Sequence, residues 1–119
     1  MNPNISLIDL SYLVALCDGD DDFMNTIIAS FVEEMPETLR QIQQKMQEGD
    51  WTSVGQLAHK MKPSVQFVGM DGTLEKTKTV ELACRNAEVC PERLGSLVQD
   101  IALETTAAIA ELEEVLSKQ

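Results

Sequence analysis

The stretch DWTSVGQLAHKMKPSVQFVGM, residues 50–70, decides the fold of this chain. Its apolar residues recur at alternating steps of three and four, which places them on one narrow stripe of an α-helix. A helix of this kind buries its stripe against other helices in a bundle. Asp50 is a suitable N-cap, because its carboxylate can accept hydrogen bonds from the first turn, and Gly49 ends the preceding helix. The apolar stripe consists of Trp51, Val54, Ala58, Met61, Val65 and Val68.

A second stripe of the same helix is polar or small and flanks the apolar one. It contains His59, the only histidine of the chain. We expect His59 to face solvent, with Lys62 about one turn further along the same flank. The stripe consists of Thr52, Gly55, His59, Lys62 and Gln66.

The segment His59–Ser64, HKMKPS, resembles the signature of the histidine-containing phosphotransfer (HPt) domain. In that family, a histidine on a four-helix bundle is followed by an aliphatic residue, a lysine, usually a glycine, and a serine at the second to fifth places. This chain matches at the aliphatic position, at Lys62 and at Ser64, and Gly69 lies near the expected helix end. It departs from the pattern at Pro63, where glycine is usual. The resemblance covers most of the chain, because the flanking helices have the expected order and spacing.

The resemblance implies that His59 accepts a phosphoryl group and relays it between receiver-domain aspartates in a two-component phosphorelay. Lys62 would pair with the phosphoryl charge, and Pro63 and Ser64 would lie at the docking surface. The chain would be a phosphocarrier rather than an enzyme. It would need no cofactor of its own, because the receiver domain brings Mg²⁺. The implied partners are response-regulator receiver domains and a sensor or hybrid histidine kinase.

The residue types suit such a role. Neutral imidazole is a good nucleophile near neutral pH, and a lysine ammonium can pair with phosphoryl oxygens without strict geometry. We expect Gly55 to leave the approach to His59 open, because it has no side chain, and Gln66 to offer a further hydrogen bond. Pro63 has no N–H for the carbonyl of His59, so we expect a bend or a water at that carbonyl.

Composition and charge indicate a single all-α domain over residues 1–119. Apolar residues make up 44% of the chain and aromatic residues only 4%, which favours helices over a sheet. A net charge of -11 argues against nucleic acid and against anionic membrane surfaces. No apolar run reaches membrane-spanning length and no signal-peptide pattern is present, so we expect a cytoplasmic protein. The three cysteines are an odd number without framework spacing and should be reduced, and no helix face demands a dimer, so we expect a monomer. The initiating methionine favours a free-standing protein.

The predicted fold is an antiparallel four-helix bundle with a short additional N-terminal helix. Pro36 should kink or break the second helix. Residues 2–8 carry apolar side chains and should pack on the bundle. The first helix should begin near Asp9 and end at Asp18, the second should cover residues 21–48, the third residues 50–68, and the last residues 91–118 with Pro91 in its first turn.

Residues 69–72 form an expected turn before the fourth helix. Thr73 or Asp71 can cap that helix, which should run to about Ala87. Its expected inward positions are Leu74, Thr77, Val80 or Glu81, Cys84 and Ala87.

The acidic run Asp18–Asp22 lacks the spacing of a calcium-binding loop and suits a helix N-terminus.

Two other functions compete with phosphotransfer: a metal or hydrolytic enzyme, and a module that only docks a partner. With one histidine and no cysteine pair at ligand spacing, a metal site or hydrolytic enzyme is a poor interpretation, and we expect no metal. A non-catalytic module that docks a receiver domain or a histidine kinase remains as the alternative, with Pro63 marking lost activity.

Overall fold

The structure is a computed structural model, and it describes residues 7–118. That part of the chain forms five helices and no strand. In order they are α1 (Ser11–Cys17), α2 (Asp21–Gln47), α3 (Trp51–Phe67), α4 (Asp71–Arg85) and α5 (Pro91–Ser117).

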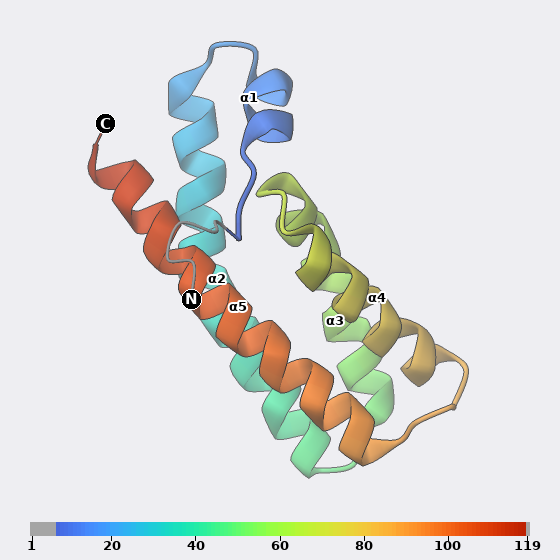
Figure 1. Cartoon of the computed structure of the whole chain (residues 1–119). Helices are drawn as coiled ribbons and strands as arrows, with labels where there is room; N and C mark the ends of the chain where they lie inside the picture. Colours follow the sequence, from blue (N-terminus) through green and yellow to red (C-terminus); the bar gives the residue numbers. More distant parts are fainter. Residues whose placement is uncertain (1–6, 119) are drawn as a thin grey trace, which may run out of the picture.

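The four longer helices form an antiparallel bundle (Figure 1). α3 packs against α2 and α4, and α5 completes the bundle through contacts with α2 and α4. Because α2 and α5 each have 27 residues, they extend beyond α3 and α4, which have 17 and 15. The short α1 packs beside the first part of α2, at the end of the bundle where α2 begins and α5 ends (Figure 1). The predicted fold class is confirmed.

The apolar stripe of α3 lies in the core, as the sequence predicts. Five of its residues are at most 2% exposed, and Trp51 packs against them at the edge. The other long helices contribute core residues at helical spacing as well. The main core positions are Ile28, Phe31, Met35, Leu39 and Ile42 on α2 and Leu94, Val98, Ile101, Ala108 and Leu112 on α5.

Side-chain caps set where two of the helices begin. Asp20 accepts a hydrogen bond from the backbone N–H of Phe23, so the acidic run is the start of α2, as predicted. Asp50 accepts from the backbone N–H of Ser53 at 3.1 Å and from its hydroxyl at 2.7 Å, which fixes the start of α3. Pro91 occupies the first turn of α5, again as predicted.

The bounds of α4 differ from the prediction. The helix begins at Asp71 after its N-cap Met70, so Asp71 and Gly72 belong to its first turn rather than to a preceding turn, and neither Asp71 nor Thr73 is the N-cap. It ends at Arg85, and Ala87, predicted to face the core, lies exposed beyond it with φ +55°. The reason is a left-handed cap, in which the N–H of Glu88 donates to the carbonyl of Ala83 and turns the chain away.

Both internal prolines are accommodated without ending their helices. α2 continues past Pro36, and its axis bends about midway along its length (Figure 1). The bend agrees with the predicted kink. α3 continues past Pro63 to Phe67.

The segment before α1 is tied to the bundle. Leu7 and Ile8 pack against the core, and the backbone N–H of Leu7 donates to Glu111. The remaining residues of the predicted arm, 2–6, lie outside the described residues. Between residues 7 and 118, no helix is both long enough and apolar enough to cross a membrane.

Gly69 allows this segment to meet the end of α3. It has φ +71°, and the N–H of Asp9 donates to the carbonyl of Val68 at 2.9 Å. A Cβ on Gly69 would overlap the carbonyl oxygen of Asp9. A side chain at this position therefore meets both a backbone clash and an unfavourable φ.

We predict that Gly69→Ala lowers the free energy of unfolding by at least about 2 kcal/mol, because strain and overlap add. Urea unfolding followed by circular dichroism measures the change. The control is Gly72→Ala, since a Cβ at Gly72 would meet no atom within 4 Å. We expect this variant to be neutral or more stable by up to about 1 kcal/mol. Equal stability of the two variants would contradict the assigned role of Gly69.

Candidate functional site

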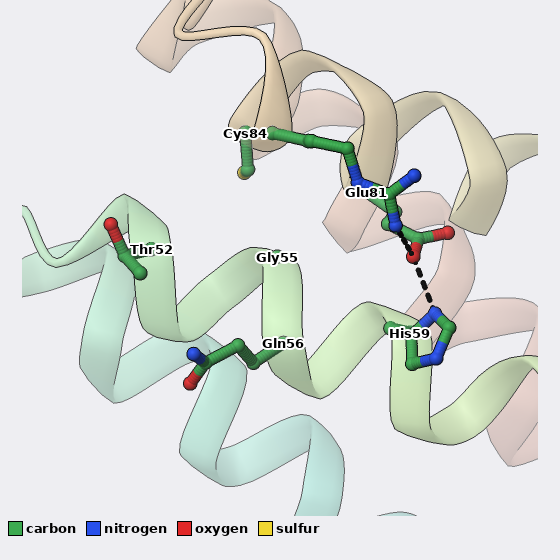
Figure 2. Close-up of a pocket in the computed structure, with 7 residues that line it drawn as sticks. Thr52, Gly55, Gln56, His59, Glu81 and Cys84 are labelled. Atoms are coloured by element: carbon green, nitrogen blue, oxygen red, sulfur yellow. Dashed lines mark hydrogen bonds and ion pairs between the residues drawn. The ribbon is translucent and has the colours of Figure 1, made fainter.

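His59 lies on the solvent face of α3, opposite the buried stripe. Its side chain is 66% exposed, as the spacing predicted, and its Nδ1 lies 2.6 Å from Oε2 of Glu81 on α4. Figure 2 shows the imidazole ring and the carboxylate facing each other between the two helices, with the other ring nitrogen directed away from Glu81.

Glu81 is the polar centre of the site. Its side chain is only 7% exposed, and both of its oxygens are used. Oε1 contacts Nζ of Lys62 at 2.6 Å, and Oε2 contacts Nη2 of Arg85 at 2.8 Å as well as His59. One buried carboxylate therefore connects two side chains of α3 with one from the next turn of α4.

The surroundings of Glu81 keep it ionised. Burial opposes ionisation, but the hydrogen bonds from Lys62 and His59 and the charges of Lys62 and Arg85 outweigh it. The pKa of Glu81 is therefore below its ordinary value. A buried carboxylate is costly without partners, so the presence of three explains how the site tolerates it.

The Glu81 contact selects one tautomer of neutral His59. An ionised carboxylate can only accept hydrogen bonds, so Nδ1 must carry the proton that it shares with Glu81. In the neutral ring, Nε2 then has the free lone pair. The site thus presents an exposed, oriented nitrogen nucleophile, with a lysine ammonium close by.

Lys62 and the predicted site residues that follow it on α3 differ in their exposure and contacts. Lys62 is 27% exposed and points to Glu81, which brings it together with His59. Pro63 and Gln66 are exposed, and Ser64 is half-buried. The docking roles that the sequence suggested for Pro63, Ser64 and Gln66 stay predictions.

Gly55 differs from its expected place. It is buried, and a Cβ there would lie 2.8 Å from the Cβ of Cys84 on α4. The two residues line the same open pocket of about 410 Å³, which also includes His59 and Glu81 (Figure 2). The missing side chain of Gly55 therefore serves the close approach of α3 and α4, not an open path for a partner.

The sequence reasoning missed Glu81 and Arg85 as site residues. Glu81 had appeared only as one of two inward-facing alternatives on its helix. An acid at an inward position signals a need for cationic partners. A search of the neighbouring helix for such partners would have led to His59 and Lys62.

The described part of the chain contains no disulfide and no candidate metal site. Cys17, Cys84 and Cys90 are free thiols. Over residues 7–118, no cluster of three or more histidine, cysteine, aspartate or glutamate side chains is arranged to hold a metal ion.

Three comparisons relate the chain to known proteins. The family model described as "Hpt domain" matches residues 26–117. A search of curated protein sequences found no match. Among solved structures, histidine-containing phosphotransfer protein B (HptB) from Pseudomonas aeruginosa PAO1 is similar, with a TM-score of 0.84, 20% identity, and coverage of 94% of this chain and 96% of that one.

A second similar structure is the HPT domain from the Hpt sensor hybrid histidine kinase from Shewanella. Its TM-score is 0.82 at 17% identity, and the match covers 95% of this chain and 96% of that one. At these identities the two solved structures support the fold alone. The family model, in contrast, matches the sequence itself over most of the chain.

We predict that Gly55→Ala lowers the free energy of unfolding by about 1–3 kcal/mol, because the new methyl group must separate α3 from α4. Urea unfolding measures the loss. Gly95→Ala is the matched control, since a Cβ at Gly95 would meet only the terminal methyl of Met46, at 3.8 Å. If both variants were equally stable, the close contact at Gly55 would not limit the packing of the two helices.

We also predict a pH-dependent difference between the wild type and Glu81→Gln. Since the pKa of Glu81 is lowered in the folded protein, its ionised form stabilises the fold above the ordinary value of 4.5. This contribution is lost as the pH falls through the folded pKa. The excess stability of the wild type should therefore shrink below pH 4.5.

Unfolding curves measured across this pH range test the prediction. All other carboxylates are common to both proteins, so their contributions cancel in the difference. A difference that is constant over the whole range would contradict the assigned ion pairs of Glu81.

Proposed function

The chain belongs to the Hpt domain family, whose function is histidine phosphotransfer in phosphorelays, and we propose that His59 is the residue that carries the phosphoryl group. The observation that carries the proposal is the His59–Glu81 contact. It supports a histidine that is exposed to a partner and yet held in one orientation by a buried carboxylate.

In the proposed transfer, Nε2 of His59 attacks the phosphorus of an aspartyl phosphate on a receiver domain. The N–P bond forms while the P–O bond breaks, and the aspartate carboxylate leaves with the electron pair. The proton on Nδ1 stays in place, so the ring becomes positively charged opposite Glu81. The carboxylate stabilises that charge as it develops.

The return step needs no further group on this chain. The aspartate carboxylate of a second receiver attacks the phosphorus, the N–P bond breaks, and its electrons return to Nε2. We propose that the receiver supplies Mg²⁺ and most of the catalytic apparatus, so this chain acts as a carrier with no cofactor of its own. A cytoplasmic location follows from exchange with such partners.

Lys62 is the proposed partner of the phosphoryl group. Its ammonium lies one helical turn from His59 and is held by Glu81 at 2.6 Å. A phosphoryl group on Nε2 would attract it, because a doubly charged anion is a stronger partner than a carboxylate that is already paired. The flexible lysine side chain allows this movement.

The proposed docking surface is the exposed side of α3 after His59, with Pro63, Ser64 and Gln66, extended by α1. Phe67 of α3 stacks on Tyr12, with ring centroids 6.1 Å apart, which links the two helices at the surface. Four large apolar side chains, each about half exposed, lie on α1 and the start of α2 and could bury area against a receiver. They are Tyr12, Val14, Leu16 and Phe23.

We predict that labelled phosphoramidate and a phosphorylated receiver domain each label the wild type but not His59→Gln. The label should be lost in acid and stable in base, as expected for an N–P bond. The exposed position of His59 makes the substitution compatible with folding, which circular dichroism checks.

Label that persists in His59→Gln would place the acceptor elsewhere. A receiver that binds the wild type without ever labelling it, together with no labelling by phosphoramidate, would favour the docking-module alternative.

A further inference from the structure

A second groove lies on the other side of α3 from Glu81, between α2 and α3. It is open, has a volume of about 450 Å³, and is lined by three of the nine lysines and arginines of the chain, Arg40, Lys45 and Lys60. None of the described residues that line it is an aspartate or glutamate. In a chain with 20 acidic residues, a groove lined by three cationic side chains and no acidic one is unusual.

The charge of α3 differs from that of the other long helices. Its 17 residues include Lys60, Lys62 and His59 but no carboxylate. α2, α4 and α5 each carry several acidic side chains. The least negative of the four long helices is therefore the one that presents His59.

The cations of the groove are available to a partner. Arg40 holds Glu37 through two hydrogen bonds and Lys45 pairs with Glu48, but all four side chains are at least 37% exposed, so solvent screens both pairs. Lys60 is exposed and makes no ion pair with any described residue. An incoming acidic group could therefore bind Lys60 directly and compete with Glu37 and Glu48 for Arg40 and Lys45.

The groove is continuous with the phosphoacceptor site. Gln56 lines both the groove and the pocket that contains His59, and Lys60 follows His59 directly. A protein that covers His59 would therefore reach the groove without a separate binding step.

We propose that this groove, lined by Arg40, Lys45 and Lys60, binds acidic side chains beside the phosphoaspartate of a receiver domain and so aligns the receiver over His59. The inference rests on the proposed function. A receiver that holds Mg²⁺ and a phosphoaspartate must gather carboxylates at its active site. The net charge of -11 would repel such a surface, and a local cluster of cations on the docking face opposes that repulsion and steers association.

The test is the charge reversal Arg40→Glu/Lys60→Glu. The matched control is Arg93→Glu/Lys118→Glu, which changes the net charge by the same amount on α5 and its C-cap. Substitutions at these exposed positions leave the core intact. We measure the second-order rate of transfer from a phosphorylated receiver, and labelling by phosphoramidate, at about 50 mM and about 500 mM salt.

We expect the groove variant to accept phosphate from the receiver at least about tenfold more slowly than the wild type at low salt, with the difference shrinking at high salt. The control variant should lose about threefold or less, since long-range charge acts weakly without a local contact. Labelling by phosphoramidate should stay within about twofold of the wild type in both variants, because no receiver docks in that reaction.

Equal slowing of the two variants would overturn the inference, because net charge alone would then explain the effect. An unchanged rate in the groove variant would overturn it as well. Slower labelling of the groove variant by phosphoramidate would assign these cations to small anions instead of a receiver. If neither phosphoramidate nor a phosphorylated receiver labels the wild type at His59, the proposed function fails, and the inference fails with it.

Discussion

The site depends on one buried carboxylate. Glu81 is almost fully enclosed between α3 and α4, and a charge in that position costs several kcal/mol unless it is paired. Its partners on α3 are His59 and Lys62, so the cost is offset only when the two helices hold these side chains within hydrogen-bond distance. The contact that orients the histidine is therefore also a condition for burying the acid.

The bundle supplies that geometry through close approaches at both ends of α3. Near its start, Gly55 lets α3 approach Cys84 of α4, and just after its end, Gly69 lets the chain pass the carbonyl of Asp9. His59 lies between these two contacts on a helix whose apolar stripe is buried except for Trp51 at its edge. A reactive side chain on a rigid element is held more accurately than one on a loop.

Charge is distributed so that the face that carries His59 differs from the rest of the molecule. The chain is strongly acidic, yet α3 has no carboxylate and is flanked by cations on α2 and by Arg85 on α4. A cluster of cations on a molecule of opposite net charge creates a local positive potential, which is the physical basis for the proposed approach of an acidic partner to this surface. Pro63 lies exposed on the same face, and α3 continues past it to Phe67.

The sequence by itself determined the helices, the Asp50 cap and the exposure of His59. Helical periodicity and capping depend on residues within a few positions of one another, which is why the α3 stripe, the Asp50 cap and the bundle could be predicted. The same local rules missed Ala87, whose place is set by the turn into α5.

Only the tertiary structure decided what surrounds the histidine. Helical phase tells which side of a helix a residue occupies, but it does not tell which atoms of another helix lie opposite. Glu81 is 22 positions from His59 in sequence, so their hydrogen bond depends on how far apart and in what register α3 and α4 pack. For the same reason Gly55, which looked like an open position on a polar stripe, is a packing contact with α4.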